Sequence, residues 1–121
     1  IFENKVKILP ILLNDCDDFE VIQIIEKIFT KNRLIIISSD LSHFHDIKTQ
    51  HQIDTKTINH IVDLEPDEIC YEHACGALAI KAMLKYIAKN SLSISNIAFG
   101  NSSDYSGDES RVVGYASFLI Y

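Results

Sequence analysis

The stretch RLIIISSDLSHFHD, residues 33–46, decides the fold because an apolar run passes directly into a cluster of polar side chains. Residues 33–38 predict a short buried strand, since four of them are aliphatic and stand in a row. Residues 38–46 then hold two aspartates, two histidines and three serines. Ligands bind beyond the carboxyl ends of strands in open α/β sheets. The sequence therefore places candidate chemistry at the end of this strand.

The residues before this stretch indicate how the strand is packed. Residues 6–13, VKILPILL, read as another buried strand. A helix is expected from Asp18. Its stripe is marked by Phe19, Ile22, Glu26 and Phe29, and Ile25 and Ile28 widen the apolar face. Strand, helix and strand joined by short connections form a βαβ unit. The fold class predicted is therefore α/β, with a mostly parallel sheet flanked by helices.

The residues after it supply two more helices and two more strands. Residues 54–62 and 75–90 carry apolar positions at helical spacing, and the second of these segments is the clearer helix. Pro66 suits the first turn of a further helix. Residues 95–103 and 111–121 are expected to be strands, separated by a turn.

Length, charge and cysteine content limit the class of protein. A chain of 121 residues is expected to form one domain over 1–121. A net charge of −6 without a basic cluster disfavours a nucleic-acid or anionic-membrane partner. No apolar run reaches the roughly 20 residues that a membrane-spanning helix needs. Three cysteines, an odd number without paired spacing, favour a reducing compartment, and the cytoplasm is the location expected.

Asp40 and His43 are the first candidate site residues. An imidazole can take and give protons near neutral pH, and a carboxylate nearby can orient it. The alternative is that Asp40 caps the following turn and that His43 is only solvated. An Asp-x-x-His spacing is common by chance, so composition alone favours this alternative.

Cys75 is the second candidate, because it lies at the start of the clearest helix. A helix N-terminus favours the thiolate, which is both the nucleophilic and the metal-binding form of cysteine. The alternative is a small buried residue beside a tight contact at Gly76, the more frequent role for a cysteine. Cys16 and Cys70 have no comparable position and are interpreted as structural.

The remaining polar groups form no recognisable site. No His-x3-His pair and no Cys-x2-Cys pair is present, so the sequence contains no complete zinc signature. The segment DYSGDESR, residues 104–111, lacks the spacing of a calcium loop and is interpreted as a solvated turn. Most of the other histidines, His45, His51, His60 and His73, are expected at the surface.

Three blocks of sequence resemble one known family. SSDLSHF (38–44), ACG (74–76) and NSSDYSGDESRVVGYASF (101–118) resemble the Memo family, the protein B component of the AmmeMemoRadiSam system. Residues 6–13 also resemble the family's central strand. The similarity runs in order over nearly the whole chain. The first and third blocks are specific when they occur together, whereas ACG alone is a weak signal.

The resemblance implies an α/β fold related to the class III extradiol dioxygenases, which use non-haem iron. It implies that His43 occupies the place of the dioxygenases' acid/base histidine, with Asp40 beside it. It also implies that Cys75 is a metal ligand. A soft thiolate together with imidazoles would suit iron or copper.

The chain also departs from the family pattern. The family's other two metal ligands are histidines in its N-terminal half, and nothing here matches that half. The chain therefore resembles the C-terminal half only, and we expect that this part alone does not hold the metal. Phe44 stands where the family often has tyrosine, and Ala77 begins a helix where the family usually has proline nearby.

Three functions remain open at this point. The first is a metal-dependent oxidoreductase with Cys75 as ligand and His43 as acid/base. The second is a non-catalytic module that binds a peptide or small molecule in the same crevice. The third is an enzyme with Cys75 as nucleophile and His43 as base. The family also suggests association with radical SAM and AMMECR1-like proteins.

Overall fold

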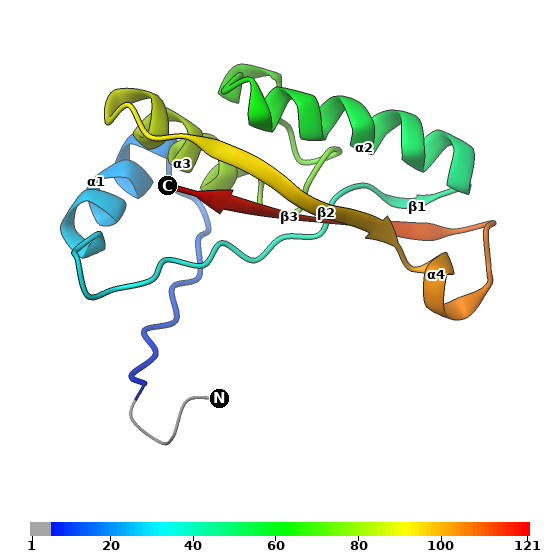
Figure 1. Ribbon diagram of the computed structural model, residues 1–121, viewed down its shortest axis with the longest axis horizontal. Helices are drawn as coiled ribbons and strands as arrows, with labels where there is room; N and C mark the ends of the chain where they lie inside the picture. Colours follow the sequence, from blue (N-terminus) through cyan, green and yellow to red (C-terminus); the bar gives the residue numbers. More distant parts are fainter. Residues whose placement is uncertain (1–5) are drawn as a thin grey trace.

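The computed structural model describes residues 6–121, so the first five residues of the expected domain lie outside it. Helices α2 and α3 lie over one face of a small sheet (Figure 1). None of the helices within the described range combines the length and the apolar composition needed to cross a membrane. In chain order, the elements are α1 (Asp18–Ile28), β1 (His43–His45), α2 (Ile47–Val62), η1 (Pro66–Glu68), α3 (Ala77–Lys89), β2 (Ile94–Asn101), α4 (Ser103–Ser106) and β3 (Val112–Ile120).

The sheet is antiparallel, and the prediction of a mostly parallel sheet is wrong. Its three strands lie in the order β1-β3-β2. Strand β3 pairs with β2 from Ile94↔Ile120 to Asn101↔Gly114, and with β1 at His43↔Val113. The chain returns from β2 to β3 through α4 and a turn at Gly107, whose φ of 72° is left-handed. Such a short return gives antiparallel neighbours, since a parallel pair needs a longer crossover.

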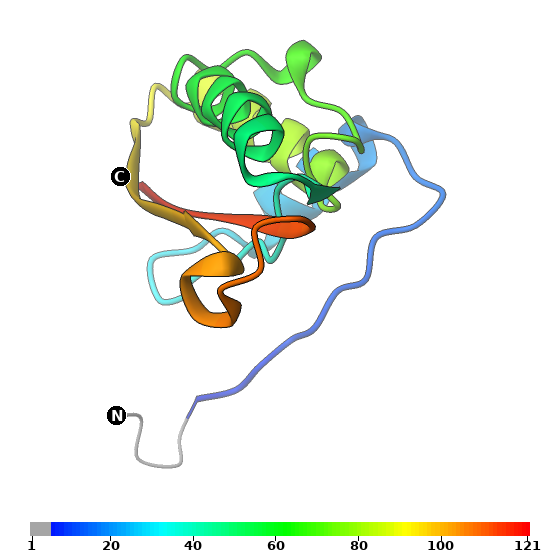
Figure 2. The same ribbon diagram turned by 90° about the vertical axis from the view of Figure 1, so that its right-hand side faces the viewer.

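The two strands expected at 6–13 and 33–38 are absent from the described sheet. Both runs are apolar, as a buried strand would be, but a strand also needs a neighbour that accepts and donates its hydrogen bonds. Residues 33–38 pass on the side of the sheet away from α2 (Figure 2). The predicted βαβ unit is therefore wrong within this chain.

Helix α1 begins where the sequence indicates, and it buries part of the expected apolar face. The side chain of Asp17 accepts from the Glu20 N–H at 2.8 Å and the Glu20 carboxylate accepts from the Asp17 N–H at 3.1 Å, forming a capping box. Val21 and Ile25 are the buried residues of the helix. Ile22 of the expected face also packs against the hydrophobic cluster, whereas Phe19 and Phe29 are exposed.

Helix α2 is longer than the sequence indicates. It begins at Ile47 rather than at residue 54. The Asp46 carboxylate accepts hydrogen bonds from the backbone N–H groups of Lys48 and Thr49, both at 3.1 Å, and so caps the helix. Asp46, the last residue of the polar segment 38–46, is therefore the N-cap of α2. Pro66 starts the short helix η1, as predicted.

Helix α3 and strands β2 and β3 confirm the predictions for the C-terminal half. Ala77, Leu84 and Ile87 of α3 are buried, on the face that the sequence indicates. They join Val21 and Ile25 of α1 in one hydrophobic cluster. The inner face of the sheet packs against this cluster through Ile94, Phe118 and Ile120.

An ion pair between Lys85 and Asp18 joins α3 to α1. The hydrogen bond to Lys85 lowers the pKa of Asp18 below its ordinary 3.8, and the same bond raises the pKa of Lys85 above 10.5. The Asp18 contribution to stability is thus present above about pH 3.8 and is lost as the pH falls through the lowered pKa. The Lys85 contribution is present below about pH 10.5 and is lost as the pH rises through the raised pKa.

We expect Lys85→Met to lower the free energy of unfolding by about 0.5–1 kcal/mol at neutral pH. The loss is small because the Lys85 and Asp18 side chains are 37% and 29% exposed, so water screens the pair. Urea titrations at pH 7 and at pH 2.5 measure the effect, and the difference from the wild type should shrink at the lower pH. Lys56→Met, on the exposed face of α2, is the control. A pH-independent loss would contradict an ion-pair contribution.

Candidate functional site

Two backbone hydrogen bonds, one to the carbonyl and one from the N–H group of Gly114, hold the loop 38–42 against β3. The Leu41 N–H donates to the Gly114 carbonyl at 2.9 Å, and the Gly114 N–H donates to the Ser42 carbonyl at 2.9 Å. Leu41 and Ser42 are buried. These contacts fix the backbone that carries Asp40 and His43.

Cys75 lies against the same loop. Its sulfur accepts a hydrogen bond from the Asp40 N–H at 3.2 Å and lies 3.6 Å from the Ser39 hydroxyl. In return, the Cys75 N–H donates to the Asp40 carbonyl at 3.2 Å. The Ser39 hydroxyl itself donates to the Asp40 carbonyl at 2.8 Å. The loop therefore contacts the Cys75 sulfur through one backbone N–H donor and one hydroxyl oxygen.

Gly76 allows this close approach. Its N–H donates to the Ser39 hydroxyl at 2.8 Å. A β-carbon at Gly76 would lie 2.7 Å from the Ser39 β-carbon and 3.3 Å from the Ser38 carbonyl oxygen, so a larger residue would push the loop away. The tight contact at Gly76 is present, but Cys75 beside it is exposed, whereas the alternative interpretation had it buried.

Asp40 and His43 form the second half of the site. A carboxylate oxygen of Asp40 lies 3.5 Å from Nε2 of His43, and both side chains reach solvent. Phe44 has a left-handed φ of 63°, which is uncommon for a residue with a bulky side chain. Its ring lies 5.7 Å from the His43 ring and 5.0 Å from the guanidinium carbon of Arg111.

The structure thus brings all three candidate residues together around Asp40. Asp40 is the common member, since its N–H contacts the Cys75 sulfur and its carboxylate contacts His43. No hydrogen bond joins the Cys75 sulfur to the His43 ring. The geometry therefore offers no direct base for a cysteine nucleophile.

The described residues do not make a complete metal centre. No group of three or more His, Cys, Asp or Glu side chains within residues 6–121 is placed to hold a metal ion. Cys75 offers one soft sulfur donor, whereas metal sites in proteins commonly use three or four protein ligands. The donor set present does not by itself fit an iron or copper ion.

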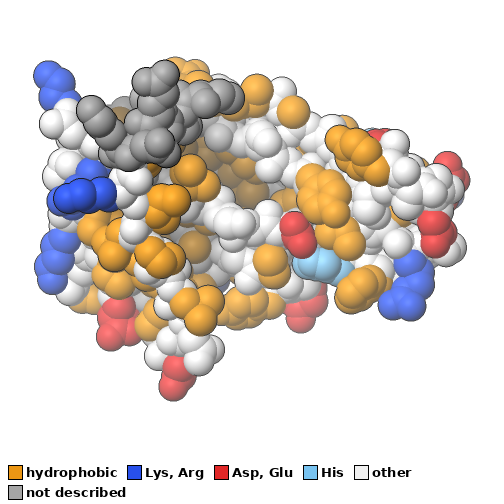
Figure 3. Space-filling model, turned by 90° about the horizontal axis from the view of Figure 1, so that it is seen from below, with side chains coloured by type: hydrophobic (Ala, Val, Ile, Leu, Met, Phe, Trp, Pro, Cys, Tyr) orange, Lys and Arg blue, Asp and Glu red, His pale blue; other side chains and the backbone are white. Residues whose placement is uncertain are grey.

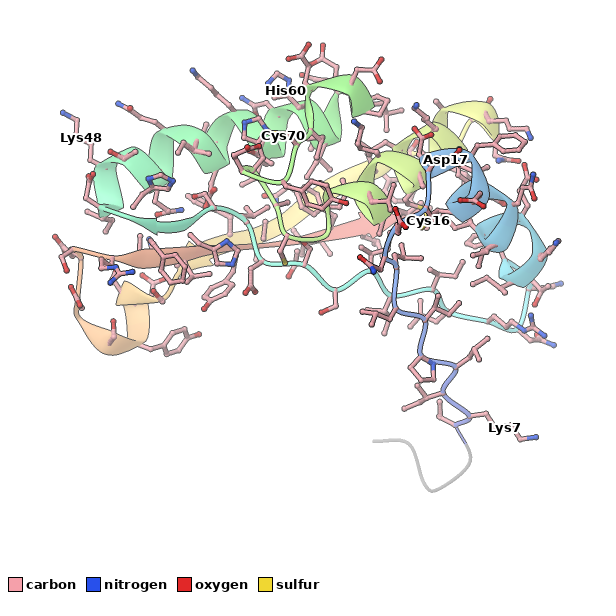
Figure 4. The ribbon with its side chains drawn as sticks, turned by 180° about the vertical axis from the view of Figure 1, so that it is seen from behind. Lys7, Cys16, Asp17, Lys48, His60 and Cys70 are labelled. Carbon is pink, nitrogen blue, oxygen red and sulfur yellow. The ribbon has the colours of Figure 1, made fainter. Side chains whose placement is uncertain are left out.

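The other histidines and cysteines lie outside this site. Nδ1 of His60 lies 2.6 Å from the Glu65 carboxylate, and Nδ1 of His73 lies 3.1 Å from a backbone carbonyl. Cys16 and Cys70 lie apart from one another, near the start of α1 and in the turn after η1 (Figure 4). The hydrogen bond to Glu72 raises the pKa of Cys70, which disfavours its thiolate.

A buried polar network beneath the loop is absent from the sequence predictions. Asp54 of α2 is fully buried, and its carboxylate accepts from the Ser42 N–H at 3.1 Å and from the Gln50 amide at 2.5 Å. The Gln50 oxygen accepts from the Asn101 side chain at 3.1 Å. The sequence holds only one signal for it, the Gln50–Asp54 spacing of four on a helix.

The comparisons with known proteins agree with the resemblance seen in the sequence. The family model described as Memo-like protein matches residues 1–119. A MEMO1 family protein of Methanosarcina mazei is 32% identical over 98% of this chain and 49% of its own length. One of Thermoplasma acidophilum is 32% identical over 98% of this chain and 47% of its own length. No solved structure matches the chain.

The chain spans about half the length of these relatives. The family match nevertheless covers all the segments that carry the candidate site, from Ser39 to Gly114. The chain belongs to the Memo-like protein family.

Proposed function

We propose that this Memo-like chain carries the thiolate and imidazole part of a metal-dependent oxidoreductase site. The observation that supports it is the central place of Asp40: the Cys75 sulfur lies 3.2 Å from the Asp40 nitrogen, and the Asp40 carboxylate lies 3.5 Å from His43. His43 and Cys75 are 32 residues apart in sequence, yet both contact Asp40.

Each residue has a role that its contacts suggest. His43 reaches solvent and can exchange a proton with a bound molecule, while the Asp40 carboxylate orients its ring. Cys75 offers a soft donor of the kind that iron and copper accept. The other ligands must come from outside the described residues, and no reaction step through a metal follows from these residues alone.

The proposal includes the setting of the protein. A small molecule or peptide is the ligand expected, and association with radical SAM and AMMECR1-like proteins follows by family analogy. A cytoplasmic location suits Cys16, Cys70 and Cys75, which are all free thiols.

Iron ligation by Cys75 tests this function. Because the other ligands lie outside the described residues, the test uses a single polypeptide in which the unmatched half of the Methanosarcina mazei relative is joined to the N-terminal side of this chain. We expect one equivalent of ferrous iron, added anaerobically, to show a sulfur neighbour in the X-ray absorption spectrum of this polypeptide with the wild-type chain. Cys75→Ser should lose that neighbour, since the other two cysteines are half-buried and lie elsewhere. Cys16→Ser and Cys70→Ser are the matched controls and should keep it. Iron bound without sulfur in the wild type, or with sulfur in Cys75→Ser, would overturn the ligand role.

A non-catalytic binding module is the second candidate. It is favoured by the exposed Phe44 ring beside Arg111. A guanidinium suits a small anionic ligand or a peptide carboxylate. Iron without a sulfur ligand in the wild-type chain would favour this function over the first.

A further inference from the structure

Residues 33–38 have the side-chain pattern of a strand that is covered on one face only. Ile35 and Ile37 pack against the hydrophobic cluster. Leu34 and Ile36 point the other way and are 82% and 78% exposed. Alternation with a period of two is the signature of a strand, and here both faces are apolar. A strand apolar on both faces is suited to burial between two layers.

The backbone of this segment also lacks partners. The Arg33 N–H donates to the Thr30 carbonyl at 2.9 Å, but residues 34–38 make no backbone hydrogen bond to any other described residue. Unpaired N–H and C=O groups on an extended apolar segment are a template for an added strand.

A second apolar segment is exposed as well. Ile8, Leu9 and Leu12, from the other run expected to be a strand, are all exposed. Hydrophobic side chains gather over the face opposite α2 (Figure 3). Tyr115 and Leu119 of β3 are also exposed to solvent. Exposed apolar area of this extent marks an interaction surface.

The relatives indicate what covers it. Members of the family are about twice as long as this chain, and they match it over 47% to 49% of their length. The unmatched half is a polypeptide of roughly the same size. We propose that residues 33–38 pair as a β-strand with a strand of the polypeptide that corresponds to this unmatched half.

This pairing has a consequence for the candidate site. Residues 33–38 run directly into Ser39 and Asp40, which contact Cys75. A strand paired along 33–38 would therefore end beside the Cys75 sulfur. The proposed pairing rests on the exposed side chains of Leu34 and Ile36 and on the unpaired backbone of residues 34–38. It does not depend on whether Cys75 binds a metal.

The experiment adds the unmatched half of the Methanosarcina mazei protein to this chain. Hydrogen exchange followed by mass spectrometry should show residues 34–38 exchanging at least tenfold more slowly in the mixture. Leu34→Lys with Ile36→Lys should weaken the association by roughly 100-fold, since both side chains would carry charge into the interface. Tyr105→Lys, 93% exposed on α4, is the control and should change the affinity less than twofold.

A half-protein can fail to fold when it is produced alone, so the same half is also joined to the N-terminal side of this chain. In that single polypeptide, the double lysine substitution should lower the melting temperature, while in the isolated chain it should not. Free exchange at 34–38 in both formats overturns the proposal. It is also overturned if the double variant behaves as the wild type does, or if the wild-type chain alone gains this protection as its concentration rises, which would indicate a second copy as the occupant.

Discussion

Gly114→Ala is expected to lower the free energy of unfolding by about 3–5 kcal/mol. A β-carbon at Gly114 would lie 1.6 Å from a carboxylate oxygen of Asp54, 2.7 Å from its Cγ and 3.0 Å from the Gln50 amide nitrogen. These distances are far below van der Waals contact, so either the Gly114 backbone or the Asp54 side chain must move.

Neither group can move without breaking further contacts. Gly114 is tied to Leu41 and Ser42 by two backbone hydrogen bonds of 2.9 Å. Asp54 is fully buried and accepts the Ser42 N–H, so its displacement would leave buried polar groups without partners. The same shift would displace the loop that carries Asp40 and His43.

Urea denaturation of wild type and variant measures this loss. Gly107→Ala is the matched control, since Gly107 has open space around it and a φ of 72°. The left-handed conformation should cost an alanine there about 1 kcal/mol. If Gly114→Ala loses no more stability than Gly107→Ala, the packing of Asp54 on Gly114 is not what requires a glycine.

The elements that the sequence predicts well are those whose signals are local. Helix α3 has an apolar face that repeats every 3.6 residues, and its predicted range of 75–90 lies close to the observed Ala77–Lys89. A capping aspartate likewise signals the N-terminal boundary of α1. Such signals depend on residues within one or two turns, so a single sequence contains them.

The predictions that failed concern residues whose partners lie far away or outside the chain. An apolar run such as 33–38 reports burial, but it carries no information about which strand lies beside it. Strand direction depends on that neighbour, so the run itself cannot distinguish a parallel sheet from an antiparallel one. The start of α2 is missed for a different reason, since Asp46 reads in the sequence only as part of a polar cluster.

In the candidate site, too, the sequence predicts the local segments but not the contacts between distant residues. The sequence identifies the segment 38–44 and the start of α3 separately, and the structure places both His43 and Cys75 against Asp40. The contacts of Ser39 with Cys75 and Gly76 are not foreseeable, because they join residues 36 and 37 apart. No spacing in a single sequence records such a pair.

Asp54→Asn is expected to lower the free energy of unfolding by about 2–3 kcal/mol, although it changes the side-chain shape very little. Asp54 accepts at both oxygens, from the Ser42 N–H and from the Gln50 amide. An asparagine can still accept the Ser42 N–H, but its NH₂ group then faces the NH₂ group of Gln50. Two donors would oppose each other in a buried position.

Rotating the side-chain amides of Gln50 and Asn101, so that their oxygen and NH₂ groups exchange places, does not remove this conflict. If Gln50 turns so that its oxygen accepts from the new amide at position 54, its NH₂ group faces that of Asn101, which now donates to Gln50 at 3.1 Å. If Asn101 turns as well, its NH₂ group faces the Ser103 N–H, which now donates to the Asn101 oxygen at 2.9 Å. A backbone N–H cannot become an acceptor, so one mismatch remains in every arrangement, either within the buried amides or at the part-buried Ser103 N–H.

Urea denaturation should therefore show the loss for Asp54→Asn but not for Asp63→Asn, an exposed position at the end of the same helix. The two variants make the same chemical change, so they differ only in what surrounds the carboxylate. Asp54 lies in a buried network whose direction is set by two backbone donors, the N–H groups of Ser42 and Ser103. Equal free energies of unfolding for the two variants would mean that the Ser42 and Ser103 N–H groups do not fix which groups donate and which accept in this network.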